Sequence, residues 1–75
     1  MNKNKDKTLA KVLFILRDIY TRHATLYRQA NIANDVDGIT EAQTAMLTCE
    51  EIAQELNIVL FNEAEKQQMD RSNNG

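Results

Sequence analysis

The spacing of apolar residues constrains the fold of this chain more than any other feature. Apolar side chains recur every three or four residues between residues 8 and 34, and the same spacing returns between residues 41 and 66. This periodicity is typical of amphipathic α-helices, in which one stripe faces a core and the other face meets solvent. Proline is absent, and both glycines lie outside the two stretches. The sequence therefore predicts two long helices with no internal helix breaker.

A polar segment between the two stretches predicts a sharp turn. Asparagine and aspartate in this segment tolerate left-handed backbone conformations, and Gly38 adopts them without a steric penalty. Thr40, with Gln43 three residues later, forms a capping box that predicts the start of the second helix. The predicted segments are a polar basic arm over 1–7, a helical hairpin over 8–66 (helix 1 about 8–34, turn 35–39, helix 2 about 40–66) and a polar flexible tail over 67–75.

Two amphipathic helices joined by a short turn form an all-α, antiparallel two-helix hairpin. Residues 1–30 hold seven basic and two acidic residues, a balance of +5, whereas residues 31–75 hold two basic and nine acidic residues, a balance of −7. A chain of 75 residues buries little surface and usually needs further stabilisation. One cysteine, Cys49, and one histidine, His23, cannot supply an internal disulfide or a structural zinc site within one chain. We therefore expect the hairpin to form a homodimer, a four-helix bundle.

The sequence carries no catalytic signature. His23 and Cys49 lie at one level of the predicted hairpin, and a two-fold dimer could gather two of each into a tetrahedral zinc set. However, neither residue has a second ligand nearby at metal-binding spacing. A Cys–His nucleophilic pair would also need an orienting group and an oxyanion hole in a concave site, which a two-helix hairpin does not offer. We expect no enzymatic activity, no cofactor and no bound metal.

The apolar runs are too short for a membrane span. The longest, residues 12–16, has five residues, whereas crossing a bilayer takes about 20. Lys11 and Arg17 bound this run, and no small-residue cleavage site follows it, so we expect no signal peptide. A single cysteine also fits a reducing compartment. These features predict a cytoplasmic protein without a membrane partner.

Several large apolar residues lie outside the main stripes, near the open end of the predicted hairpin. Reflection about the turn places Phe14 and Ile15 level with Ile58 and Val59, and a lone hairpin would expose Phe14, Ile15, Ile58 and Phe61 there as one patch or two flanking patches. Clustered exposed apolar side chains mark an interface. We therefore expect a small regulatory or inhibitory protein that docks on a larger protein, as bacterial or phage accessory proteins of this size often do. The candidate partner-binding residues are Phe14, Ile15, Ile58 and Phe61 for contact, with Arg22 and Arg28 as charged orienters.

The basic residues of the first helix support an alternative function. Lys11, Arg22 and Arg28, with the lysines of the arm, could form a basic stripe against phosphates. The overall pattern resembles the Rop type of helical hairpin, which controls plasmid copy number and whose dimer binds RNA loops through one helix face. That resemblance implies an RNA-binding or RNA-regulating hairpin dimer. The isoelectric point near 5.2 and the interleaved acidic residues weaken phosphate binding, so a protein partner is the preferred hypothesis.

Overall fold

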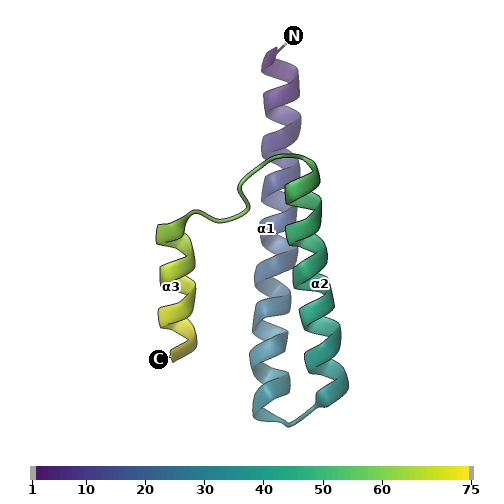
Figure 1. Cartoon of the computed structure of the whole chain (residues 1–75), viewed down its shortest axis with the longest axis vertical. Helices are drawn as coiled ribbons and strands as arrows, with labels where there is room; N and C mark the ends of the chain where they lie inside the picture. The colour runs from purple at the N-terminus through teal and green to yellow at the C-terminus, as the bar shows by residue number, and fades with distance from the viewer. Residues whose placement is uncertain (1, 75) are drawn as a thin grey trace.

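The computed structural model describes the backbone of residues 2–74 and the side chains of residues 6–69. It contains three helices: α1 (Asn2–Ile32), α2 (Val36–Glu55) and α3 (Glu63–Asn74). Helices α1 and α2 run antiparallel and side by side, and α1 extends beyond α2 at its N-terminal end (Figure 1). In this view α3 stands on the other side of α1. The all-α hairpin is confirmed, and no strand occurs within residues 2–74.

The hairpin packs mainly through small side chains. Ala30 and Ala42 are buried near the turn, where such short side chains let the helix axes approach closely. Toward the open end, a cluster of Leu16, Cys49 and Ala53 forms the core, and Leu60 joins it from the chain that follows α2. Half-buried apolar residues pack around this cluster: Val12, Leu13, Ile19, Tyr20, Ile58 and Phe61.

A Schellman motif ends α1 and leads directly into α2. Asn34 has a φ of 56°, a left-handed conformation that asparagine tolerates. Its N–H donates to the carbonyl of Asn31 at 3.2 Å, and the N–H of Asp35 donates to the carbonyl of Ala30 at 2.9 Å. Asp35 then caps α2, because its carboxylate accepts a hydrogen bond from the N–H of Gly38 at 3.1 Å. The connection between the two helices is therefore shorter than predicted.

The predicted capping box at Thr40 and the left-handed role of Gly38 are wrong. Thr40 lies inside α2, where its hydroxyl donates to the carbonyl of Val36 at 3.1 Å. Gly38 has no positive φ. A Cβ at that position would lie 2.6 Å from Asp35 Oδ2 and 3.2 Å from the Cβ of Ala30. The missing side chain thus makes room for the cap and for close helix packing, while Asn34 turns the chain.

The prediction that helix 2 continues to about residue 66 is also wrong. A second Schellman motif ends α2 at Glu55, with Asn57 at a φ of 56°. The N–H of Ile58 donates to the carbonyl of Ala53 at 2.9 Å, and the N–H of Asn57 donates to that of Gln54 at 3.0 Å. Both long helices therefore end on an asparagine in the same conformation.

The segments predicted as a polar arm and a flexible tail are largely helical. Helix α1 already begins at Asn2, and α3 covers the tail as far as Asn74. A capping box starts α3: the N–H of Glu65 donates to Asn62 Oδ1 at 2.8 Å, and the N–H of Asn62 donates to Glu65 Oε1 at 3.1 Å. Residues 1 and 75 lie outside the described backbone.

A row of threonines follows the solvent side of α2. The hydroxyls of Thr40, Thr44 and Thr48 each donate to the carbonyl oxygen four residues earlier, at 3.1, 2.9 and 2.8 Å respectively. All three residues are exposed. This bonding pattern satisfies each hydroxyl within its own helix.

Candidate functional site

Arg17 joins the hairpin to the chain that follows α2. Its Nε donates to the carbonyl of Leu60 at 2.7 Å, and its Nη2 lies 3.1 Å from Glu65 Oε1 in an ion pair. Its guanidinium carbon lies 5.4 Å from the ring centroid of Phe61, within cation–π range. Three contacts from one half-buried side chain thus fasten the connection and the first turn of α3. The sequence analysis did not single out Arg17, since its partners lie 43 and 48 residues away.

Ile58 and Phe61 are more buried than predicted. The Phe61 ring packs on Tyr20, with ring centroids 5.0 Å apart and planes tilted by 59°, a favourable aromatic geometry. Ile58 packs against the core cluster. The reason is the break at Asn57, which releases the chain from α2 and lets both side chains fold back onto the hairpin. They do not form an exposed patch with Phe14 and Ile15.

Ile58 and Phe61 nevertheless line an open groove of about 640 Å³ between α2 and the chain up to Met69. Two strongly exposed apolar residues also line it, Leu47 at 58% and Val59 at 69%. Acidic residues of α2 contribute polar lining. We name this feature the α2–α3 groove, defined by Leu47, Glu50, Glu51, Ile58, Val59 and Phe61.

Phe14 and Ile15 are exposed as predicted, at 75% and 56%. Successive helical residues point about 100° apart, so the two side chains lie on different sides of α1. Ile15 shares a row with Ile19 and Leu26, at steps of four and seven residues, whereas Phe14 stands among polar neighbours. The structure therefore separates these two candidate residues from each other.

Arg22 and Arg28 both have partners on α1. Arg22 Nε lies 3.2 Å from Asp18 Oδ2, an exposed ion pair between successive turns. Arg28 Nη2 donates to Thr25 Oγ1 at 3.3 Å. Arg28 also lines a hollow of about 420 Å³ with Met46 and Met69, on the side of the hairpin that α3 covers. The two arginines thus lie apart, and a carboxylate reduces the positive charge beside Arg22.

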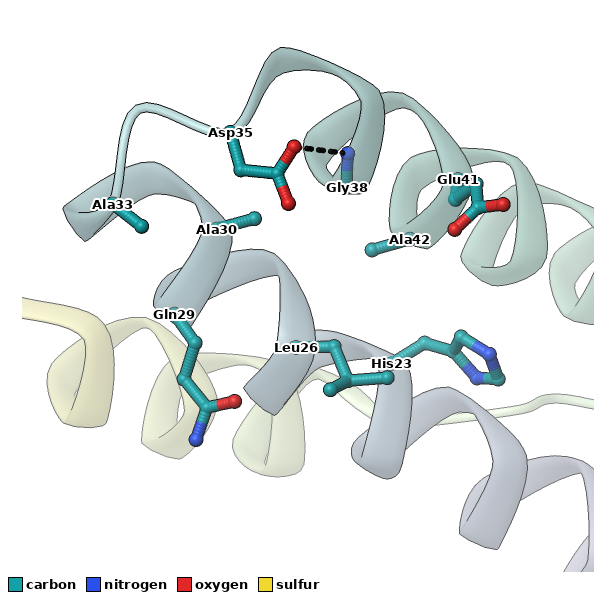
Figure 2. Close-up of a pocket in the computed structure, with 9 residues that line it drawn as sticks. All are labelled: His23, Leu26, Gln29, Ala30, Ala33, Asp35, Gly38, Glu41 and Ala42. Atoms are coloured by element: carbon teal, nitrogen blue, oxygen red, sulfur yellow. Dashed lines mark hydrogen bonds between the residues drawn. The ribbon is translucent and has the colours of Figure 1, made fainter.

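A third hollow, of about 710 Å³, lies near the turn between α1 and α2 (Figure 2). His23 and Leu26 reach it from α1, and Glu41 reaches it from α2, while α3 runs behind α1 in this view. His23 Nδ1–H donates to the carbonyl of Ile19 at 2.8 Å, which fixes one ring nitrogen. The Asp35 carboxylate at its rim already caps α2. The hollow offers no nucleophile with an orienting base.

Cys49 is a core residue. It is 3% exposed, and burial together with the nearby charge of Glu50 raises the pKa of its thiol. A thiol that holds its proton is a poor nucleophile and a poor metal ligand. Among the described side chains, no group of three or more His, Cys, Asp or Glu residues could hold a metal ion.

Comparison with known proteins gives no relative from which a role could be transferred. No family model matches the chain, and neither the curated proteins nor the solved structures include a significant match. None of the helices in the described part of the chain is both long and apolar enough to cross a membrane. Function must therefore be argued from the surface of the molecule.

Proposed function

We propose that the protein is a small, cytoplasmic regulatory or inhibitory module without chemistry of its own. It docks on a larger protein and acts as a homodimer, in which two hairpins form a four-helix bundle. The observation that carries the docking function is the α2–α3 groove, with its exposed apolar side chains and its acidic residues.

The composition of the groove favours a polypeptide that is apolar and basic. Leu47 and Val59 expose a large part of their surface, which a partner would remove from water. Glu50 and Glu51 line the groove on the α2 side and Lys66 lines it on the α3 side, so the ionised lining is acidic on balance. An amphipathic helix with apolar anchors and flanking Lys or Arg residues matches both properties.

The groove is also well fixed for binding. Arg17 holds the carbonyl of Leu60, and Phe61 packs on Tyr20, so the wall formed by the connection is fastened to α1. A preformed wall lowers the entropic cost of binding. Among the candidate residues, Ile58 and Phe61 belong to this contact and Arg28 lies in a neighbouring hollow. Phe14, Ile15 and Arg22 are not among its lining residues.

The small size of the core supports the homodimer. The buried set contains only two large aliphatic side chains, Leu16 and Leu60, and no large side chain in the described range is fully buried. A four-helix bundle would bury more apolar surface per chain. No specific observation favours the RNA-binding alternative, because Asp18 pairs with Arg22 at the centre of the proposed basic stripe.

A peptide-library selection on the purified protein tests the docking function. We expect selected peptides to combine apolar and basic residues, and Val59→Asp to weaken their binding at least about tenfold. Phe14→Asp is the matched control, because Phe14 is at least as exposed as Val59 but lies outside the groove. Circular dichroism verifies the helix content of both variants. Selection of acidic peptides, or binding lost in Phe14→Asp and kept in Val59→Asp, would contradict the proposal.

A further inference from the structure

One face of the hairpin is apolar and is not covered by α3. On α1, Ile15 and Leu26 are 56% and 51% exposed, and on α2, Ile52 and Leu56 are 41% and 38% exposed. Leu26 lines the hollow near the turn, which contains no residue of α3 (Figure 2). Residues three, four or seven positions apart share one face of a helix, so Ile15 on α1 and Ile52 and Leu56 on α2 lie on the same side of the hairpin as that hollow. We name this surface the open face, defined by Ile15, Ile19, Leu26, Ala45, Ile52 and Leu56.

The two long edges of the open face carry opposite charges. On the α1 edge, Lys11 and Arg22 lie four residues before Ile15 and Leu26, and the Asp18 carboxylate pairs with Arg22. On the α2 edge the charged residues are acidic: Asp37, Glu41 and Glu55. One surface therefore combines an apolar centre, a basic edge and an acidic edge.

A second copy of the chain carries the complement of this pattern. We propose that the open face binds a second copy, related by a two-fold axis parallel to the helices, so that α1 of each chain packs on α2 of the other. This inference rests on the proposed homodimer and specifies its interface. The same patch meets itself across the axis, as in an isologous interface.

Charge decides between the two simple face-to-face arrangements. With the axis parallel to the helices, height along them is preserved and the basic edge of each chain faces the acidic edge of its partner, so that the partner's Glu55 lies at a height between Lys11 and Arg22. With the axis across the helices, α1 would lie on α1 and α2 on α2, which brings like charges together. Either arrangement leaves the α2–α3 groove of each chain uncovered, because none of the residues that define the open face lines that groove.

Mass in solution tests the choice of face. Light scattering after size exclusion, at micromolar concentrations, should give twice the 8.6 kDa chain mass for the wild type. The double variant Ile15→Glu, Ile52→Glu should fall to the mass of one chain. Phe14→Glu is the matched control, because Phe14 adjoins Ile15 and is more exposed but lies off the open face. It should keep the dimer mass.

Charge reversal tests the orientation without removing apolar surface, and so applies even if the double variant unfolds. Arg22→Glu should weaken the dimer about fivefold, since it turns a carboxylate toward the acidic edge of the partner at two symmetry-related positions. Adding Glu55→Arg in the same chain should restore the affinity. Because Arg22 and Glu55 lie on opposite edges of one hairpin, the rescue reports a contact between chains.

The possible results distinguish failure of the homodimer from failure of the proposed interface and of its orientation. A wild-type mass of one chain at all concentrations would overturn the homodimer and this interface together. A dimer that survives the open-face substitutions, or that Phe14→Glu dissociates, would overturn the interface and leave the homodimer standing. A dimer that Arg22→Glu strengthens, or that the second reversal weakens further, would overturn the orientation.

Discussion

The hairpin and the segment after it are held together in different ways. Helices α1 and α2 are joined along their length by buried apolar residues, from Leu16 and Ala53 to Ala30 and Ala42. Helix α3 is polar on nearly every side, and the main hold on its first turn comes from Arg17. Apolar packing thus stabilises α1 and α2 along their shared length, whereas the contacts of Arg17 hold α3 only at its first turn. We expect α3 and its connection to open as a unit while the hairpin stays folded.

The largest effect should follow from damage to the hairpin core. Leu16→Ala removes the most central large side chain and should lower the free energy of unfolding by about 2–5 kcal/mol. Chemical denaturation followed by circular dichroism measures this loss. Ile32→Ala, at a position 85% exposed, is the control and should change stability by less than about 0.5 kcal/mol. Equal effects from both substitutions would contradict a core centred on Leu16.

The next largest loss of stability should be confined to α3 and the connection before it. Arg17→Ala removes the bond to the Leu60 carbonyl, the ion pair with Glu65 and the contact with Phe61, at a cost of about 1–3 kcal/mol. Amide hydrogen exchange should accelerate in residues 57–74 and change little in α2. Within one chain Arg22→Ala breaks only an exposed ion pair, so it should cost the hairpin less than about 0.5 kcal/mol and leave exchange in residues 57–74 unchanged. Uniform acceleration across all three helices would show that the two regions are not separate.

Substitutions at the two left-handed asparagines, Asn34 and Asn57, also distinguish the hairpin from the segment after α2. Asn34→Ala and Asn57→Ala should each cost about 1 kcal/mol, since both positions have a φ of 56°. The cost at Asn34 should appear in hairpin stability, and the cost at Asn57 should appear as faster exchange in α3. Glycine at either position should restore or improve stability. If alanine at both positions destabilised the same region, the two helix ends would not be independent.

The smallest effect concerns the buried thiol. Burial raises the pKa of Cys49, so above the ordinary thiol pKa the unfolded chain releases this proton while the folded chain retains it. The contribution to stability is therefore complete below that pH and declines as the pH rises through the alkaline range. Denaturation of the wild type and of Cys49→Ala across this range gives the difference in slope. Identical slopes would contradict the raised pKa.

The hairpin could be predicted from the sequence because the pattern that specifies each helix is local and repeats along it. Apolar steps of three and four residues define both helices, and Asn34 with Asp35 marks the turn. The end of α2 was missed because Val59 and Leu60 continue the apolar spacing without interruption beyond Asn57. An asparagine inside such a stripe is the one local signal of that break.

The candidate site was less accessible from the sequence than the fold. Exposure of Phe14 and Ile15 followed from their positions off the main stripe, but neither residue lines the α2–α3 groove. The partial burial of Ile58 follows from the break at Asn57, and Phe61 packs on Arg17 and Tyr20, which lie more than 40 residues away. No periodic pattern encodes a single long-range side-chain contact, so the α2–α3 groove required the structure.

The threonine row gives the solvent side of α2 a surface that offers hydrogen-bond acceptors rather than donors. The hydroxyl hydrogens of Thr40, Thr44 and Thr48 are already committed to the backbone, so toward solvent these groups can only accept. The carboxylates of Glu51 and Glu55 nearby are acceptors as well. The outer side of α2 therefore favours ligands that bring donors, such as guanidinium or amide groups. Phosphates and other acceptor-rich ligands find few donors there.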